Sequence, residues 1–107
     1  MNKMRPVHPG EVLREEYLDP LGMSSRSLAA ALGVPANRVT SIVNESRSVS
    51  ADTALRLARY FGTSAEFWLN LQMMFDLRSA EIASGAEIKR TVKPRRKSGG
   101  PIPAAAD

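Results

Sequence analysis

Apolar residues recur at helical spacing in five stretches of this chain, and polar residues occupy most positions between them. In the first stretch, Leu13 and Tyr17 share one side of a helix, while Glu15 and Glu16 point away from it. No stretch alternates as a strand would, and no internal repeat is visible. The pattern therefore predicts an all-α domain of five helices, at residues 11–18, 24–32, 36–44, 51–61 and 65–85.

Proline, glycine and serine residues mark the ends of these predicted helices. We expect Pro20 and Gly22 to end the first helix, and Gly62 to end the fourth in a left-handed conformation. His8 is the single histidine, and we expect it to cap or turn the chain rather than to bind a metal, because no ligand partner lies at suitable spacing. Serine side chains can cap three further helices, at Ser24 or Ser25, Ser50 and Ser64.

A sharp corner is predicted between the second and third helices. Gly33 can adopt positive φ at little cost, and Pro35 fixes φ where the next helix begins. Ala29 offers a small side chain where the helices approach, and Val39 and Ile42 face back toward it. The spacing of these residues fits the helix-turn-helix motif, in which the second helix enters the major groove of DNA.

The outward face of the third helix carries small or hydrogen-bonding side chains. Asparagine pairs with adenine, arginine pairs with guanine, and serine or threonine pairs with several bases. Asn37 and Arg38, near the start of the helix, are the favoured base contacts, while Ser25, Arg26 and Arg47 lie where a phosphate strand would pass. The predicted DNA-binding residues are Ser25, Arg26, Ala36, Asn37, Arg38, Thr40, Ser41, Asn44 and Arg47.

A helical hairpin with glycine at its corner also occurs in proteins that never bind DNA, so the motif alone leaves that alternative open. Local charge favours the DNA reading. Residues 24–60 carry five arginines against Glu45 and Asp52, a net charge of +3. A positive excess of this kind attracts phosphate, although it is also compatible with a solvated surface.

The fourth and fifth helices should supply the rest of the core and a dimer surface. Trp68 is expected to be buried rather than to stack on a base. We expect burial of Leu55, Leu57, Ala58 and Phe61 in the fourth helix and of Phe67, Leu71 and Met74 in the fifth. This leaves an apolar surface that predicts a homodimer interface, unless the helix wraps wholly into its own core. The residues of this dimer face are Met73, Phe75, Leu77 and Ile82.

The composition of the chain excludes several classes of protein. A length of 107 residues suits one small domain, and the absence of cysteine favours a cytoplasmic protein without disulfides. No apolar run approaches the roughly 18 residues of a membrane span. With one histidine and no phosphate-cradling glycine loop, the sequence predicts no catalytic residue, no metal and no cofactor.

The positive charge of the chain is concentrated at its C-terminal end. Residues 1–86 contain nine basic and nine acidic residues, whereas residues 87–107 contain six basic and two acidic ones. From Ile88 onward the chain is rich in lysine, arginine, proline and glycine, with few large apolar groups. We therefore predict a folded domain at 1–86 and a basic tail at 87–107 that is disordered when free.

Three runs together carry a resemblance to a known family: RPVHPGEVLREEYLDPLGMS, SLAAALGVPANRVTSIVN and SADTALRLARYFGTSAEFWLNLQ. They resemble the HigA (VapI-like) antitoxins, a branch of the Xre/Cro helix-turn-helix group, over about Met4 to Glu81. The resemblance implies a five-helix, lambda-repressor-like domain that forms a homodimer and represses its own promoter by binding a palindromic operator in double-stranded DNA. It also implies a cognate HigB-type toxin, usually a RelE-like mRNA endonuclease.

Two departures from the family pattern bear on function. After the third helix the family typically reads N-G-K-R-G, whereas Glu45 here replaces the first glycine and places a negative charge near the expected DNA backbone. The basic tail lies beyond the familiar pattern. A solitary Xre-type repressor, or a module that sequesters a toxin and binds DNA weakly, therefore remain alternatives.

Overall fold

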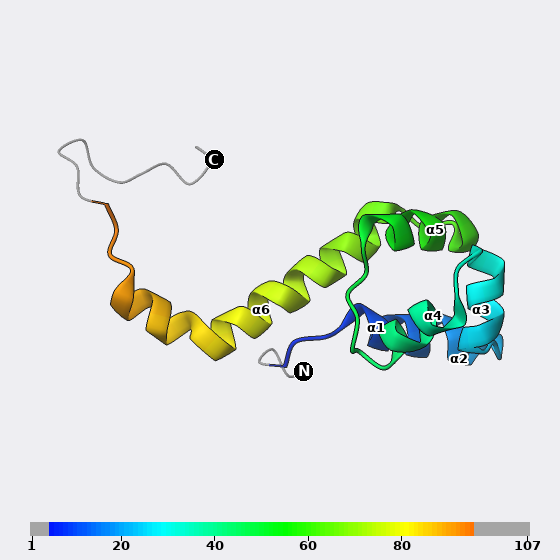
Figure 1. Cartoon of the computed structure of the whole chain (residues 1–107), viewed down its shortest axis with the longest axis horizontal. Helices are drawn as coiled ribbons and strands as arrows, with labels where there is room; N and C mark the ends of the chain where they lie inside the picture. Colours follow the sequence, from blue (N-terminus) through cyan, green and yellow to red (C-terminus); the bar gives the residue numbers. More distant parts are fainter. Residues whose placement is uncertain (1–4, 96–107) are drawn as a thin grey trace.

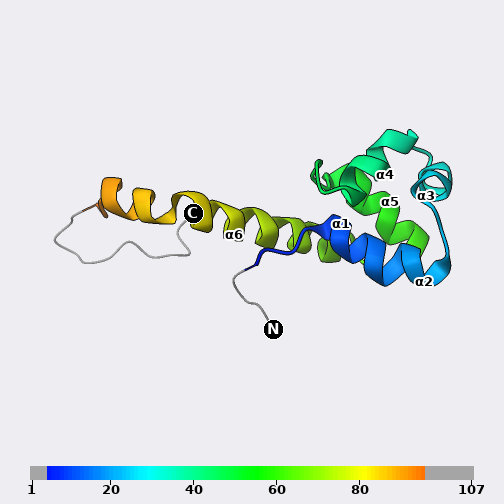
Figure 2. The ribbon, with the colours of Figure 1, turned by 90° about the horizontal axis from the view of Figure 1, so that it is seen from below.

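The computed structural model describes residues 5–95, and these residues form helices without strands. Pro9–Val12 (α1), Leu13–Leu18 (η1) and Asp19–Leu21 (α2) follow one another without a break and make one rod (Figures 1 and 2). Four more helices follow, so the predicted all-α, five-helix architecture is confirmed. They are α3 (Ser25–Leu32), α4 (Ala36–Val43), α5 (Ala51–Phe61) and α6 (Ala65–Thr91).

The first rod is longer than predicted, because Pro20 does not end it. A proline inside a helix lacks a donor, and its ring collides with the carbonyl four residues earlier. Here η1 is a π-helical stretch in which the Asp19 N–H bonds to the Arg14 carbonyl, five residues back. This wider turn accommodates the proline ring. The rod ends at Gly22, the other residue that we predicted to end it, whose left-handed φ of 62° allows its own N–H and that of Met23 to bond back to the rod.

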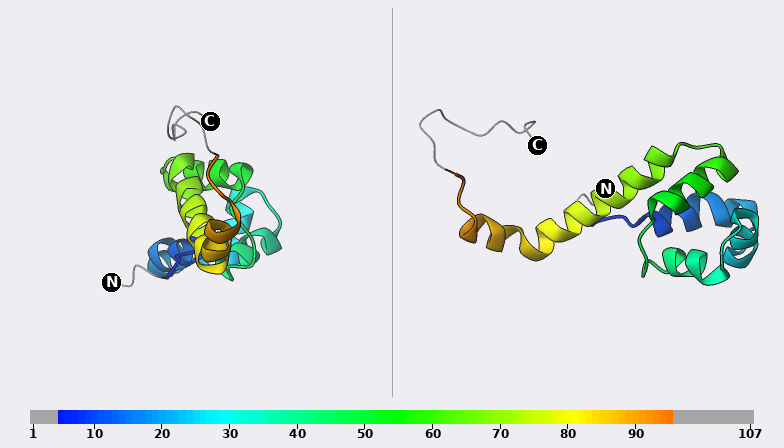
Figure 3. Two further views of the ribbon diagram at one scale, coloured as in Figure 1. Left: turned by 90° about the vertical axis from the view of Figure 1, so that its left-hand side faces the viewer. Right: turned by 45° about the horizontal axis from the view of Figure 1, so that its top comes forward.

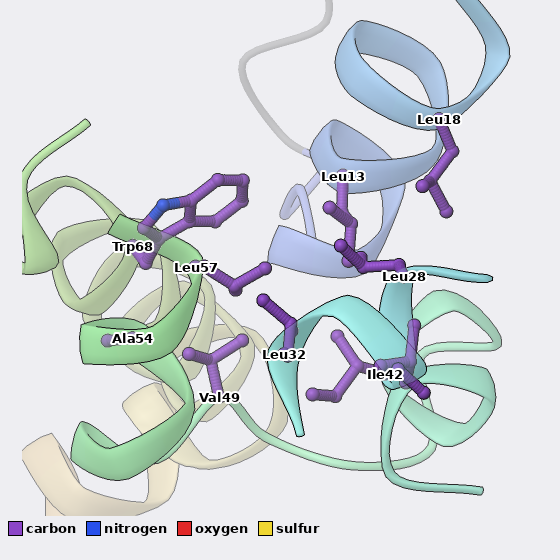
Figure 4. Close-up of a cluster of buried hydrophobic side chains, with 11 residues drawn as sticks. Leu13, Leu18, Leu28, Leu32, Ile42, Val49, Ala54, Leu57 and Trp68 are labelled. Atoms are coloured by element: carbon purple, nitrogen blue, oxygen red, sulfur yellow. The ribbon is translucent and has the colours of Figure 1, made fainter. Parts of the chain in front are cut away.

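The core lies between the first rod, the α3–α4 pair, α5 and the start of α6 (Figure 4). Trp68 is fully buried, as predicted, and its ring nitrogen donates to the Thr63 hydroxyl at 2.8 Å. Each large apolar side chain buried here contributes about 1.5–3 kcal/mol to stability. The largest side chains in this core are Trp68, Leu13, Leu28, Ile42 and Leu57.

The predicted helix caps are confirmed. The hydroxyls of Ser24, Ser50 and Ser64 each accept a hydrogen bond from the N–H three residues later. Gly33 and Gly62 adopt left-handed φ values of 73° and 74° at the ends of α3 and α5. Local side-chain chemistry therefore sets most helix boundaries in this chain.

The inward faces of α5 and α6 differ from the prediction at three positions. Leu55 is 63% exposed, because Ala54 and Leu57 define the buried side of α5. On α6 the buried positions are Trp68 and Gln72, four residues apart, which turns Phe67 and Met74 toward the surface. Burial of Leu55, Phe67 and Met74 was therefore wrongly predicted, while Leu57 is buried and Phe61 and Leu71 are partly buried against the core.

Helix α6 projects away from the rest of the domain as a long rod (Figure 3). It continues past Gly85 to Thr91, so the predicted disorder is wrong for residues 87–91. Most of the predicted tail, from residue 96 onward, lies outside the described residues. Among residues 5–95, no helix has the length and apolar character needed to span a membrane.

Candidate nucleic-acid interface

The α3–α4 corner has the geometry that the sequence predicts. Ala29, Val39 and Ile42 are each 1% exposed and belong to one core cluster. At the corner, the N–H groups of Gly33 and Val34 donate to the carbonyls of residues 30 and 29, which closes the end of α3. One face of α4 is therefore fixed in the core, and the opposite face is fixed toward solvent.

The outward face of α4 consists of the side chains that we predicted for it. Asn37 and Thr40 are exposed, as are Ala36 at the start of the helix and Asn44 at its C-cap. Ser41 lies at the edge of this face and is half-buried. The Thr40 hydroxyl donates to the carbonyl of Ala36 at 3.1 Å, so its methyl group and its lone pairs are what it presents outward. The face is narrow and polar, as insertion into a major groove requires.

Two residues of the first rod fix the C-terminal end of α4, and sequence reasoning missed both roles. Gly10 lies so close to α4 that a β-carbon there would be 1.8 Å from the Ile42 carbonyl oxygen. Arg14 donates to the Val43 carbonyl at 3.1 Å, which satisfies an unpaired acceptor at the helix end. A signal for Gly10 was present, because glycine inside a helix is disfavoured unless a close approach requires it. Arg14 carries no such local signal.

The N-terminal end of α4 is tied to α5 by a network of charged side chains. Arg38 and Arg56 both donate to the same oxygen of Asp52, at 2.7 and 2.8 Å. Arg56 also donates to the carbonyl of Leu32 at 2.8 Å. The hydrogen bonds from Arg56 and then Arg38 hold the pKa of the Asp52 carboxyl below its ordinary value, so Asp52 is ionised at neutral pH. Arg38 is thus half-buried and paired, rather than free at the edge of the helix.

The loop after α4 is anchored to α6 and has a strained backbone at one position. The buried Gln72 side chain accepts a hydrogen bond from the Val49 N–H at 2.8 Å, which ties the loop to α6. Glu45 has φ of 66°, the sole left-handed non-glycine residue in the described chain. Its carboxylate lies 4.0 Å from Arg14. The expectation that position 45 suits glycine is thereby confirmed.

The predicted phosphate contacts lie on either side of α4. Arg26, in the first turn of α3, and Arg47, in the loop, are exposed and form no ion pair within residues 5–95. Ser25 is half-buried beside Arg26. Arg47 lines a shallow hollow with Arg38 and with hydroxyl-bearing residues at the start of α5. Two exposed cations without an ion-pair partner in the described residues thus lie on the segments directly before and after α4 in the chain, where we predicted phosphate contacts.

The single histidine belongs to the fold, as predicted. His8 Nδ1 accepts a hydrogen bond from the Gly10 N–H at 2.8 Å and so caps the first rod. The ring is 3% exposed and packs edge-on against Phe75 at 4.7 Å. Burial lowers the pKa of His8, so the ring is neutral near pH 7 and Nδ1 remains an acceptor. Within the described residues, no group of three potential ligands could hold a metal ion.

The predicted dimer face on α6 is partly open. Met73, Leu77 and Ile82 are 57%, 59% and 60% exposed. Phe75 is half-buried and in contact with His8, so it contributes more to the domain itself than to an outer surface. Met74, which we predicted to be inside, is 64% exposed. Met73 and Leu77, four residues apart, share one side of the projecting helix, whereas Ile82 lies nearer the opposite side, so Met73 and Leu77 are the part of the predicted face that forms one apolar patch.

Comparisons with known proteins identify the family. The helix-turn-helix family matches residues 13–68, which is more than half of the chain. Virulence-associated protein I of Dichelobacter nodosus is 56% identical over 80 residues, covering 75% of this chain and 74% of the relative. Antitoxin HigA-1 of Vibrio cholerae is 44% identical over 75 residues, or 70% of each chain. The chain belongs to the HigA-type helix-turn-helix antitoxins.

Solved structures of HigA-type proteins share this fold. The Pseudomonas aeruginosa antitoxin HigA, solved with the higBA promoter, superimposes with a TM-score of 0.83 at 49% identity, over 86% of this chain and all of that one. Antitoxin GraA, solved in complex with its operator, gives a TM-score of 0.83 at 50% identity, over 91% of this chain and 98% of that one. The HigA-type domain is thus a DNA-binding regulator fold, a class distinct from enzymes.

Proposed function

We propose that this HigA-type antitoxin represses its own operon by inserting α4 into the major groove of a promoter operator. The observation that carries the proposal is the outward polar face of α4, whose opposite face is held in the core. Arg26 on α3 and Arg47 in the loop after α4 are both exposed and add positive charge to the segments next to this helix. Asn37 and Arg38 are assigned to base edges, with Thr40, Ser41 and Asn44 next to them. The two structural neighbours solved with promoter or operator DNA support DNA binding by a domain of this fold.

The operator is proposed to be palindromic, because the protein is proposed to bind as a dimer. Met73 and Leu77 form an apolar patch on one side of α6 that would pair with a second copy, while Ile82 lies nearer the opposite side of the helix. A two-fold dimer would place its two α4 helices about 34 Å apart, one turn of B-DNA. An inverted repeat then matches the symmetry of the protein.

The antitoxin role is proposed to be exerted on a RelE-like, HigB-type toxin whose gene lies beside that of this protein. Similarity to antitoxin HigA-1 of Vibrio cholerae supports this assignment. Co-expression of the tagged protein with the product of the adjacent gene tests it. Relief of growth arrest and co-purification support the assignment, whereas a free protein with no toxic neighbour would favour a solitary repressor.

Operator binding is tested by anisotropy titration against the upstream promoter DNA and a scrambled duplex, each at two salt concentrations. We expect a clear preference for the promoter. Asn37→Ala is expected to cost about 1–3 kcal/mol and to relax preference at one base pair, whereas Arg47→Ala weakens binding to all sequences alike. Arg59→Ala, an exposed arginine on α5, is the matched control. Weak binding that is equal on both duplexes would instead favour toxin sequestration.

A further inference from the structure

The Asp52 carboxylate is an unexpected neighbour for a DNA-reading helix. It lies in the first turn of α5, 55% exposed, and one of its oxygens accepts from both Arg38 and Arg56. A negative charge beside a phosphate-binding surface weakens attraction to DNA of any sequence. Asp52 therefore opposes the general affinity of the interface while it engages the arginine that is best placed to read a base.

The contacts of Asp52 fix the position of the Arg38 guanidinium. Arg56 is anchored to the Leu32 carbonyl at the end of α3, and it anchors Asp52 in turn. Asp52 then holds one terminal nitrogen of Arg38 at 2.7 Å. A chain of three hydrogen bonds thus connects the α3–α4 corner to a side chain at the start of α4.

Restraint of Arg38 has a consequence for recognition. An arginine side chain loses about 2 kcal/mol of rotamer entropy when it is ordered, and a guanidinium that is already oriented avoids part of that loss on binding. Within residues 5–95, the second terminal nitrogen and Nε of Arg38 form no hydrogen bond, so they remain available as donors. A fixed fork also discriminates better between bases, because its geometry matches only one acceptor pattern.

We propose that Asp52 is a positioning residue for specificity: it orients Arg38 toward one base pair of the operator and lowers the affinity for DNA of other sequences. This inference rests on the proposed operator-binding function. It assigns Asp52 no contact with DNA. The carboxylate acts through Arg38 on discrimination and through its charge on non-specific binding.

The test uses Asp52→Asn in the full-length chain, which removes the charge and keeps the shape. Wild type and variant are titrated against the operator, against operators with each base pair substituted in turn, and against a scrambled duplex. We expect Asp52→Asn to lose about tenfold discrimination at one base pair, which equals about 1.4 kcal/mol. Binding to the scrambled duplex should tighten several-fold, with a steeper salt dependence.

Arg38→Ala and the double variant complete a cycle. We expect Arg38→Ala to lose discrimination at the same base pair, and Asp52→Asn to cause no further loss of discrimination when Arg38 is absent. Glu66→Gln is the charge-matched control, since Glu66 is exposed on α6, a helix with no predicted DNA contact. Circular dichroism checks that each variant folds.

The outcomes separate the two proposals. Equal weakening on every duplex would show that Asp52 merely braces α4 against α5, and would overturn this inference while leaving operator binding intact. Additive losses in the cycle would overturn it as well, because they would show that Asp52 acts independently of Arg38. A wild-type protein that binds the operator and the scrambled duplex equally would overturn the proposed function, and this inference with it.

Discussion

Replacement of Gly10 by alanine is the sharpest test of how the first rod positions α4. The new β-carbon would lie 1.8 Å from the Ile42 carbonyl oxygen and 2.8 Å from its carbon. Real β-carbons are essentially never closer than 3.0 Å to such atoms, so the two helices would have to separate by more than 1 Å. Both atoms are backbone, so no side-chain rotation relieves the collision.

The magnitude follows from two opposing terms. Alanine is a better helix former than glycine by about 0.8–1 kcal/mol, which favours the variant. Overpacking costs about 1–3 kcal/mol, and more where backbone must move. Separation of the first rod from α4 also loosens the packing of Leu13 and Ile42, both 1% exposed. Because backbone must move here, we place the cost at or slightly above the upper end of that range, about 3–4 kcal/mol, so the net loss is about 2–3 kcal/mol. For a domain of this size that is a fall in Tm of roughly 10–20 °C.

Thermal unfolding followed by circular dichroism measures this loss, and promoter titration measures its effect on α4. Gly85→Ala is the matched control, since its β-carbon would find its nearest neighbour at 4.0 Å and we expect a slight gain in stability. Operator affinity should fall for Gly10→Ala even well below its Tm, because α4 is displaced. A Gly10→Ala protein as stable as wild type would refute the close approach of these helices.

Three further predictions address the loop, the cap and α6. Glu45→Gly relieves the left-handed strain at φ 66°, so denaturant unfolding should show a gain in stability of about 1 kcal/mol. The variant should also bind the promoter more tightly. Weaker promoter binding would contradict this prediction. Burial lowers the pKa of His8 in the folded state, so as pH falls the unfolded chain takes up this proton before the folded protein does. Tm should therefore fall as pH drops below about 6.5. His8→Asn should abolish this dependence, and a dependence that persists in the variant would show that another group causes it. Leu77→Glu should give monomers in sedimentation experiments. Leu55 on α5 is similarly exposed, so Leu55→Glu is the control and should leave the dimer intact. A dimer that survives Leu77→Glu would show that this part of α6 is not in the interface.

Sequence patterns predicted those parts of the fold that depend on neighbouring residues. The serine caps, the left-handed glycines at 33 and 62 and the buried face of α4 each follow from residues within about one or two helical turns. Pro20 misled the prediction because a π-helical turn upstream absorbed its ring. On α6 the burial of Trp68 was predicted correctly, but Phe67 and Met74 were wrongly placed inside and Gln72 was missed, because the shape of a core built from distant segments selects the buried positions.

Contacts between distant segments account for the rest of the candidate site. Arg14 reaches a carbonyl 29 residues away, and the partners of Asp52 lie on two helices. A hydropathy pattern cannot predict such pairs, since each of these charged side chains would also suit a solvated surface. Gly10 is the exception, because an unfavourable residue in a helix is itself evidence of a neighbour.

The contacts at the two ends of α4 differ in kind, and the difference bears on how the proposed site works. At the C-terminal end, Gly10 packs closely against one backbone carbonyl and Arg14 donates a hydrogen bond to another. That end of α4 can therefore shift only if the whole first rod shifts. At the N-terminal end the polar tie is an exposed ion pair between side chains, Arg38 with Asp52. Exposed ion pairs contribute little to stability, so this contact is better suited to orienting the Arg38 side chain than to holding the helix in place. A rigid end that sets the depth of α4 and a side-chain contact that orients Arg38 together suit a helix that must dock in one orientation and present one guanidinium to a base edge.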